Sequence, residues 1–440
     1  MTRVGFISLG CSKNLVDTEV MLRRLHDSGF EITPDETEAE IIIINTCGFI
    51  ESAKQEAIDN ILDAAKLKEW GKCRHIIATG CLVERYREEV MKELPEIDGI
   101  VGVGSLIDIA DACQAVMRGE KYTSFRDKNT SPLGGDRILT TDEHTAYLKI
   151  AEGCDNLCTY CAIPLIRGKL RSRTVEDIVK EAQDLEALGV KELNLIAQDT
   201  TRYGLDIYGE YSLARLVREI CKNTNIPWIR LLYCYPDKIT DELIDEMKNN
   251  PRLLSYMDIP IQHISDNVLT RMNRHGSSEL IRETVKRLRD NIPDVVLRTT
   301  AMVGFPGESE EDFEELCQFI KDTRFERFGA FTYSEEEGTA AVNLDGKIDE
   351  QTKQDRYDVI MQTQLTLTEE MSAENIGKTY TVICDGFDTV AEVYYGRSYR
   401  DAPDVDGRVY FTSDTKVEKG DFAEVKITEA LDYDLVGYKI

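Results

Sequence analysis

Three cysteines, Cys154, Cys158 and Cys161, are the residues of this 440-residue chain whose spacing points most directly to chemistry. Three thiolates so close together can ligate three irons of a cubane [4Fe–4S] cluster, and the local sequence offers no fourth. The remaining iron is then free to bind a small molecule and to pass an electron to it. The triad therefore predicts a redox centre that holds a second ligand.

Structural zinc and disulfide bonds are the alternative interpretations of these cysteines. Zinc sites usually combine one close pair of ligands with a second Cys or His pair. No such pair follows within 60 residues, and the next cysteines, Cys221 and Cys234, lie in apolar segments. Disulfides form in oxidising compartments, and we expect no signal peptide here. An iron–sulfur cluster is the favoured interpretation, and zinc stays open as an alternative.

The composition is that of a globular protein with a strong acidic excess. The chain carries 81 acidic and 53 basic side chains, a net charge of −28. This charge disfavours broad binding to nucleic acid and favours a basic partner, such as a protein. The longest apolar runs, such as residues 41–44, are too short to cross a bilayer, so we expect no membrane partner. Twelve cysteines without a secretory segment predict a reducing, cytoplasmic location.

Alternating strand and helix patterns in residues 1–120 predict an N-terminal parallel α/β domain. Cys11, Cys47 and Cys81 each come just after one of its predicted strands. Ligands gather at the carboxyl ends of the strands in such sheets, so we expect the three thiols to meet at one edge. They form a candidate second metal site. The alternative is three cysteines with no shared role, because free cysteine is commonly buried.

A linker is predicted at residues 121–139, and the strand–helix alternation resumes in a domain at residues 140–373. Six predicted βα units are too few for a complete eight-stranded barrel. We therefore expect a partial (β/α)6 barrel whose active face lies at the strand carboxyl ends. The cysteine triad follows the first strand. Gln198 and Asp199 follow the second, and Gly304 and Gly307 follow the fifth.

Residues 374–440 change to short alternating strands broken by Gly and Asp, which predicts a small antiparallel β-barrel as the third part of an α/β multidomain fold. Residues 375–440 contain 8 basic and 13 acidic side chains, a net charge of −5. Small barrels that bind oligonucleotides usually present basic grooves. We therefore do not expect nucleic acid as the direct substrate.

Four segments carry a resemblance to a known enzyme family: LGCSKNLVDTE, NTCGFIESAKQEAID, GCDNLCTYCAIPLIRG and FTYSEEEGT. Over essentially its whole length the chain resembles the methylthiotransferases among the radical S-adenosylmethionine (SAM) enzymes. The family's order of a methylthiotransferase domain, a radical SAM partial barrel and a TRAM-like barrel is similar as well. The first two segments and GRSYRDAPDVDG resemble the RimO type, which acts on a ribosomal protein.

The resemblance implies two [4Fe–4S] clusters, one on each cysteine triad. SAM would bind the first cluster and yield a 5′-deoxyadenosyl radical, and the second cluster would present methylated sulfur to the resulting carbon radical. The implied substrate is the β-carbon of an aspartyl residue in the twelfth protein of the small ribosomal subunit. Such a basic protein suits an acidic barrel. An electron donor and a sulfur source are further implied partners.

Several residues are candidates for contact with SAM, although no catalytic side chain is assigned. Tyr160 lies beside the cluster, Gln198 and Asp199 suit the ribose hydroxyls, and Gly304 and Gly307 allow close backbone approach.

For two sets of basic residues in the central domain, the sequence allows two interpretations: contact with SAM or substrate, or a structural or solvated role. Arg298, on the fifth strand, is a candidate partner of the SAM carboxylate, with a structural ion pair as an equal alternative. The basic run at residues 167–173 is expected to be a solvated face, with contact to substrate or to the SAM carboxylate as the alternative.

Two other functions remain as alternatives. A transfer RNA methylthiotransferase would perform the same chemistry on an adenosine, and a net-basic C-terminal domain would have favoured it. A two-cluster electron carrier needs no half-barrel, and its clusters are normally fully ligated.

Overall fold

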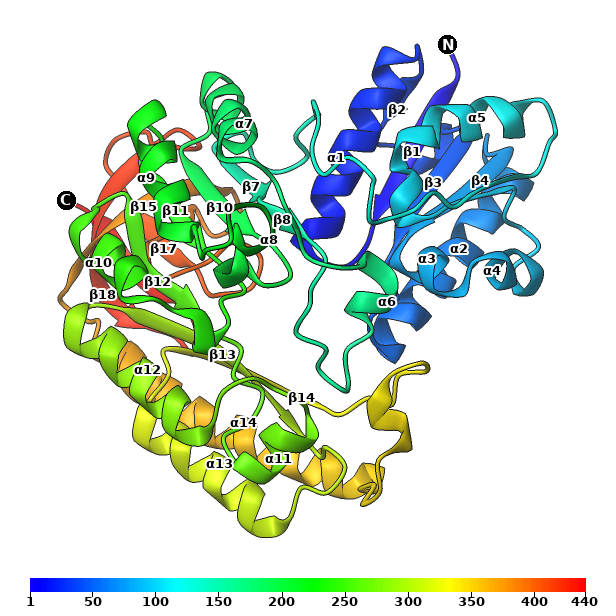
Figure 1. The fold of residues 1–440 in the computed structure, drawn as a ribbon. Coiled ribbons are helices and arrows are strands. Elements are labelled where there is room, and N and C mark those ends of the chain that lie inside the picture. The colour runs from blue at the N-terminus through cyan, green and yellow to red at the C-terminus, as the bar shows by residue number, and fades with distance from the viewer.

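Two six-stranded parallel sheets and one closed barrel organise the chain in the computed structural model, which describes residues 1–440 (Figure 1). The N-terminal sheet and the central sheet lie on either side of helix α6 (Ile163–Arg167), and the barrel packs against the central sheet. The predicted α/β multidomain fold class is confirmed.

The N-terminal sheet has the strand order β2-β1-β3-β4-β5-β6, with every neighbouring pair parallel. Its strands are β1 (Arg3–Ser8), β2 (Glu31–Thr33), β3 (Ile41–Thr46), β4 (His75–Gly80), β5 (Gly99–Val101) and β6 (Tyr122–Ser124). Its helices are α1 (Ser12–Asp27), α2 (Glu51–Trp70), α3 (Cys81–Tyr86), α4 (Glu88–Glu93) and α5 (Ile109–Met117). The edge strands β2 and β6 have three residues each, too few to produce a sequence pattern, and β6 falls in the predicted linker.

Strand β3 shows why this sheet forms. It begins with four isoleucines and is buried on both faces, as expected of a central parallel strand. Ile42 and Ile44 pack with α2, whereas Ile41 and Ile43 pack with α1 and α5 on the opposite face. Because side chains point alternately to the two faces of a strand, β3 contributes to the apolar cores on both faces of the N-terminal sheet.

The central sheet has the order β14-β13-β12-β11-β10-β7, again parallel throughout, and its edge strands β7 and β14 do not pair. It is therefore an open half-barrel. Its strands are β7 (Thr145–Lys149), β10 (Glu192–Ile196), β11 (Trp228–Leu231), β12 (Leu253–Asp258), β13 (Val296–Val303) and β14 (Arg327–Thr332). A short hairpin, β8 (Ala151–Glu152) with β9 (Arg171–Ser172), brackets the cysteine loop and α6.

Helices cover the outer face of the half-barrel and complete the largest apolar core. They are α7 (Val175–Ala187), α8 (Leu205–Tyr208), α9 (Leu213–Asn223), α10 (Asp241–Asn249), α11 (Asp266–Arg271), α12 (Ser278–Asn291), α13 (Glu310–Thr323) and α14 (Glu350–Ala373). Thr174 caps α7, and Ser309 with Asp312 forms a capping box at α13. None of the helices combines the length and the apolar character that crossing a membrane requires.

The C-terminal barrel closes in the order β15-β16-β17-β19-β18. Its strands are β15 (Thr379–Asp388), β16 (Val393–Arg397), β17 (Val409–Thr412), β18 (Phe422–Ala430) and β19 (Leu435–Lys439). One pair, β17 with β19, is parallel, so the prediction of an antiparallel barrel is wrong for that pair. The parallel pair arises because β18 lies between them in sequence and runs antiparallel to β19.

A loop of the barrel, residues 398–406, inserts into the concave face of the half-barrel. The hydroxyl of Tyr147 donates to Asp404 at 2.8 Å, and that of Tyr256 donates to Asp406 at 2.6 Å. Ala402 is fully buried in one apolar cluster with Tyr256 and with Val16 of α1. The inner face of the half-barrel is therefore partly covered by α1 and by this loop, with a cavity of about 430 Å³ between them, and the strand carboxyl ends remain for chemistry.

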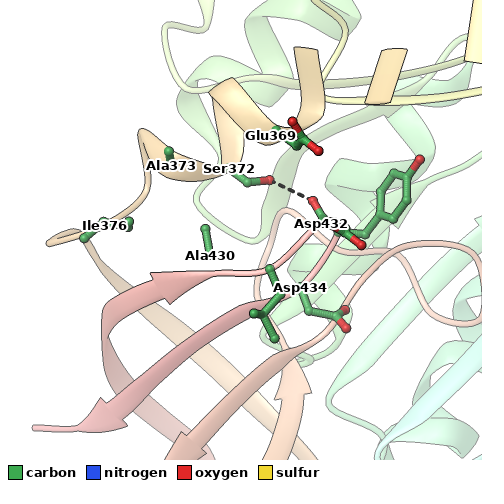
Figure 2. Close-up of a pocket in the computed structure, with 9 residues that line it drawn as sticks. Glu369, Ser372, Ala373, Ile376, Ala430, Asp432 and Asp434 are labelled. Atoms are coloured by element: carbon green, nitrogen blue, oxygen red, sulfur yellow. Dashed lines mark hydrogen bonds between the residues drawn. The ribbon is translucent and has the colours of Figure 1, made fainter. Parts of the chain in front are cut away.

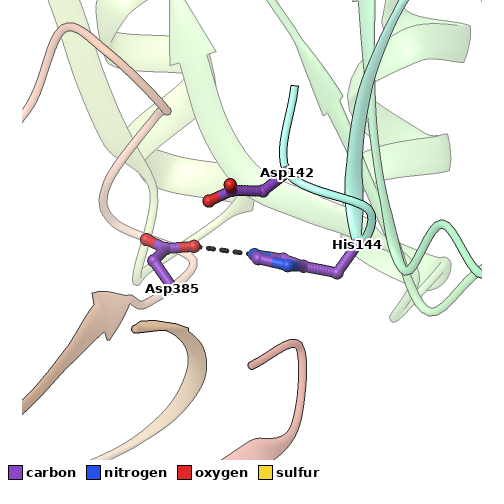
Figure 3. A group of neighbouring side chains, drawn as sticks. All are labelled: Asp142, His144 and Asp385. Carbon is purple, nitrogen blue, oxygen red and sulfur yellow. Dashed lines mark hydrogen bonds and ion pairs between the residues drawn. The ribbon is translucent and has the colours of Figure 1, made fainter. Parts of the chain in front are cut away.

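Three possible metal ligands, Asp142, His144 and Asp385, meet where β7 faces the barrel (Figure 3). His144 and Asp385 share a hydrogen bond of 2.8 Å. Asp142 also pairs with Lys419, and Asp385 pairs with Arg397 at 2.9 Å. Because both carboxylates already face cations of the barrel, the group is an ion-pair contact between the two parts of the chain.

Glu192 is the central anion of this interface. Its carboxylate is completely buried and pairs with Arg230 at 3.0 Å and with Arg397 of the barrel.

We predict that Glu192→Gln lowers the free energy of unfolding by about 3–5 kcal/mol, because two buried guanidinium groups lose their counter-charge. Urea denaturation at neutral pH measures the loss. Glu370→Gln, which breaks an exposed pair with Arg324, is the control and should cost less than about 1 kcal/mol. Equal losses of unfolding free energy in the two variants would contradict the prediction that Glu192 stabilises this interface more than an exposed ion pair does.

Candidate functional site

The loop between β8 and α6 carries the local triad, Cys154, Cys158 and Cys161, all half-buried. Gly153 before it has φ +78°, and a Cβ there would lie 2.0 Å from the carbonyl oxygen of Lys169. Only glycine permits this close return of the chain. The amide of Cys161 donates to the carbonyl of Cys158 at 3.0 Å, so the loop curls and gathers its thiols.

A buried cation and two tyrosines surround this triad. The hydroxyl of Tyr235 lies 3.1 Å from Sγ of Cys158. Arg274 donates to that hydroxyl at 2.7 Å and to the Tyr160 hydroxyl at 3.2 Å, and its guanidinium lies 3.9 Å from the centre of the Tyr235 ring. Arg274 is only 7% exposed. Its positive charge therefore acts at short range on any anion held by the loop.

The protonation of these thiols indicates what they can bind. Burial raises the pKa of Cys154 and of Cys161 to about 12. Both are therefore neutral thiols at pH 7 unless a cation draws the protons away. Three soft sulfur donors presented by one loop suit an iron–sulfur cluster.

The second triad, Cys11, Cys47 and Cys81, is assembled from three loops at the carboxyl ends of β1, β3 and β4, as the sequence predicts. A Cβ at Gly10 would lie 2.9 Å from Cβ of Cys47, so the first two loops touch. Burial raises the pKa of Cys81 to about 12. Burial also acts to raise the pKa of Cys11, but the charges of Lys13 and Arg167, together with backbone hydrogen bonds, outweigh it and lower that pKa.

Two asparagines tie these loops together. Nδ2 of Asn14 donates to the carbonyls of Leu9 at 2.8 Å and of Thr46 at 3.1 Å. Nδ2 of Asn45 donates back to the Asn14 carbonyl at 2.8 Å. Side-chain amides thus satisfy backbone carbonyls of the two segments that present Cys11 and Cys47.

The two triads meet across helix α6. Cys81 at the start of α3 shares a buried apolar cluster with Ala162 and Ile166. Ala162 directly follows Cys161. The segments that carry the two triads therefore pack together, although up to 150 residues separate their cysteines in sequence.

Family models match each part of the chain. They are the radical SAM superfamily over residues 148–320, the uncharacterized protein family UPF0004 over residues 3–102, and the TRAM domain over residues 376–440.

Curated relatives named ribosomal protein uS12 methylthiotransferase RimO match almost the whole chain. The relative from Thermoanaerobacter sp. (strain X514) is 50% identical over 438 residues, 99% of this chain and 100% of that protein. The relative from Clostridium perfringens (strain SM101 / Type A) is 51% identical over 437 residues, 99% and 97% of the two chains. The chain belongs to the RimO family.

Solved structures similar to this RimO-family chain include the radical SAM methyltransferase TsrM from Kitasatospora setae. Its TM-score is 0.55 at 14% identity, covering 76% of this chain and 72% of that one. The cobalamin-dependent radical SAM enzyme OxsB has a TM-score of 0.54 at 13% identity, covering 84% and 56%. These likenesses show the fold.

The residues predicted to contact SAM after β10 differ in their availability. Gln198 donates its amide to Glu152, and its Oε1 atom is buried without a partner, so an acceptor stays free. Asp199 is 1% exposed, and its carboxylate accepts from Asn156 at 2.7 Å and from the Thr201 hydroxyl at 2.6 Å. Asp199 therefore shapes its own loop, and its predicted ribose contact is not supported. The Gln198 and Tyr160 contacts stay predictions.

Gly304 and Gly307 both have positive φ, but protein atoms fill the space beside them. A Cβ at Gly304 would lie 2.3 Å from Cγ of Lys353, and one at Gly307 would lie 2.4 Å from Nε of Arg271. Their amides donate to Glu308 and to the Gly346 carbonyl. The space on the Cβ side of each glycine is therefore taken by side chains of the chain itself, and close approach of SAM to the backbone at these two positions stays a prediction.

Arg298 forms the ion pair that the sequence left as the alternative to a SAM contact. It lies 2.9 Å from Asp258 and 3.7 Å from Asp406 of the inserted barrel loop. The predicted pairing with the SAM carboxylate is not supported, because two carboxylates already hold the guanidinium.

The expectation of a solvated basic face is wrong for Arg167 and Arg173, which are 2% and 5% exposed. Lys169 alone in that run is exposed. Sequence reasoning also missed Tyr235 and Arg274. Tyr235 follows strand β11 and could have been found by the same rule as Gln198, whereas Arg274 lies in no motif.

A cavity of about 720 Å³ lies between the end of α14 and the β18–β19 turn, far from both triads in the fold (Figure 2). Glu369 and Asp434 are on its lining, and Ser372 donates to the carbonyl of Asp432 across it. It belongs to the barrel surface and contains none of the predicted site residues.

The buried carboxylate of Glu308, which lies beside Gly304 just before α13, makes the free energy of unfolding depend on pH. Its carboxylate accepts from the Gly304 amide at 2.8 Å and pairs with Arg356 at 2.7 Å, yet burial outweighs both and raises its pKa from 4.5 to about 7. Between these values the native state holds a proton that the unfolded chain has lost, so stability falls as pH rises through this window.

We predict that Glu308→Gln flattens the dependence of unfolding free energy on pH between about 4.5 and 7, by up to about 3 kcal/mol. Urea midpoints across this range measure the slope. Glu314→Gln, on the exposed face of α13, is the matched control. A slope unchanged by the Glu308 substitution would contradict the assignment.

Proposed function

We propose that this chain is a radical SAM methylthiotransferase that adds a methylthio group to the β-carbon of an aspartyl residue in ribosomal protein uS12. The observation that supports the proposal is the packing of the two cysteine-bearing segments, in which Cys81 shares a buried apolar cluster with Ala162, the residue that follows Cys161. A reaction that makes a carbon radical and then gives it sulfur needs both centres within reach of one atom.

Each triad offers three thiolates and leaves one iron of a [4Fe–4S] cluster for another ligand. The local triad Cys154, Cys158 and Cys161 would hold the cluster that binds SAM, and the N-terminal triad would hold the second. When bound, these groups supply the electron that cleaves SAM to a 5′-deoxyadenosyl radical, and the sulfur that is transferred.

The chain's own residues would bind and orient SAM and exclude water. Arg274 provides a fixed positive charge beside Cys158 through Tyr235. Tyr160, Phe305 and Tyr333 form a continuous edge-to-face aromatic wall, with ring centres 6.3 and 5.1 Å apart. Such a wall shields a reactive radical from solvent without offering polar hydrogen-bond partners along its ring faces.

The charge of the chain supports a basic protein as substrate. Ribosomal proteins bind RNA and are basic, whereas this chain has a net charge of −28 and an acidic barrel. A polyanionic transfer RNA would be repelled by the same surface. The chemistry also requires an external electron donor and a sulfur source. Twelve free cysteines suit the reducing cytoplasm.

The two triads should separate two steps of the reaction. Replacing Cys154, Cys158 and Cys161 with Ala should abolish 5′-deoxyadenosine formation under anaerobic reducing conditions. Replacing the N-terminal three should leave SAM cleavage and stop methylthio transfer. Iron should fall from about eight to about four per chain in each triple variant. Cys221→Ala is the control. Formation of 5′-deoxyadenosine by the first variant would refute the assignment.

The substrate can be tested directly. Incubation of the reconstituted protein with purified uS12, SAM, sulfide and dithionite should add about 46 Da to one aspartyl peptide, seen by mass spectrometry. Unmodified transfer RNA in the same assay should gain no methylthio adenosine. The reverse pattern would favour the transfer RNA alternative.

A further inference from the structure

Arg167 occupies the point where the two triads meet. It is the last residue of α6, the helix that begins two residues after Cys161. Its side chain is among the largest that are completely enclosed by the protein. The apolar side of the same helix, through Ala162 and Ile166, packs against Cys81.

The guanidinium of Arg167 bonds to the N-terminal part of the chain on both of its outer nitrogens. One nitrogen donates to Sγ of Cys81 at 3.4 Å and to Oδ1 of Asn14 at 2.9 Å. The other donates to Asp17 at 2.7 Å and to Glu152 at 3.0 Å. One planar group thus joins a predicted cluster ligand to the segment that carries the other triad.

The charges around Arg167 balance before any cluster binds. Asp17 and Glu152 are both shared with Lys149, so two buried cations face two buried anions. A thiolate at Cys81 adds one negative charge, and Arg167 is the cation that donates to it. Hydrogen bonds and positive charge at a ligating sulfur stabilise the more negative, reduced cluster.

We propose that Arg167 is a positioning residue for the N-terminal cluster. Its guanidinium holds the Cys81 sulfur by a charge-assisted hydrogen bond and raises the reduction potential of that cluster. This inference rests on the proposed function, because it takes Cys11, Cys47 and Cys81 to be cluster ligands. It extends that function by giving a residue of the SAM-cluster segment control over the electronics of the other centre.

The test uses the full-length chain with Cys154, Cys158 and Cys161 replaced by Ala, so that only the N-terminal cluster is present. Redox titration followed by electron paramagnetic resonance gives its midpoint potential, and iron analysis gives its occupancy. Arg167→Met should reduce the ratio of reduced to oxidised cluster about tenfold at a fixed potential, a shift of about 59 mV for one electron.

Matched variants separate this role from a structural one. Arg173→Met removes another buried arginine, paired with Asp177 and Glu181 and without contact to a thiol, and should leave the potential unchanged. Arg167→Lys keeps the charge and should shift the potential less than Met does. Glu152→Gln removes a negative charge beside the guanidinium and should shift the potential in the opposite direction.

The outcomes are distinguishable. An iron-loaded Arg167→Met protein with the parent potential overturns the proposal. If that variant does not load iron, Arg167→Lys and Glu152→Gln decide, and potentials equal to the parent in both overturn it. A parent protein that binds no iron overturns the assignment of the N-terminal triad itself, and the proposal with it.

Discussion

The buried charge cluster of Asp17, Lys149, Glu152 and Arg167 is the interaction on which the site depends. All four residues are at most 4% exposed, and they come from α1, β7, β8 and α6. Removing such charges from water is costly, and their mutual attraction repays the cost only when each has its partner in good geometry. A displaced N-terminal sheet would leave the Asp17 carboxylate without a cation, and it would leave Lys149 and Arg167 to share Glu152 alone. The cluster therefore selects one arrangement of the two sheets, and that arrangement puts the cysteine triads side by side.

The barrel is also a structural part of the site. Its loop at residues 398–406 packs against the concave face of the half-barrel, with Asp404 and Asp406 bonded to tyrosines of β7 and β12. Part of its acidity is thus directed inward, where Arg298 and Arg327 meet Asp406. The net charge of the barrel overstates the charge that a partner meets. The same loop explains why Arg298 is an ion-pair residue.

How far the sequence predicts the site depends on the range of the interactions involved. Convergence of Cys11, Cys47 and Cys81 follows from parallel-sheet geometry, since strand ends meet at one edge. The half-barrel follows from counting βα units. Arg167 was not predictable as a buried group, because its partner Asp17 lies 150 residues away and a basic run ordinarily faces solvent. The packing of Lys353 and Arg271 on the Cβ side of Gly304 and Gly307 likewise leaves no local sequence pattern. Sequence periods of two or 3.6 residues indicate which face of a strand or helix is buried. They carry no information about which distant charged residue completes an ion pair.

Different interactions bring the cysteines of each triad together, and this difference determines how much of the fold must form before each triad can bind a metal. Cys154, Cys158 and Cys161 lie in one short loop whose own backbone gathers them, so a metal closes only a few residues of chain. The N-terminal thiols come from segments separated by more than thirty residues each. Asn14 and Asn45 join the Cys11 and Cys47 segments, and the pairing of β3 with β4 places Cys81 beside them. Closing such loops costs more entropy, and the folded sheet meets that cost before any metal arrives. The N-terminal centre therefore requires the native sheet, whereas the local triad can gather its ligands within its own segment.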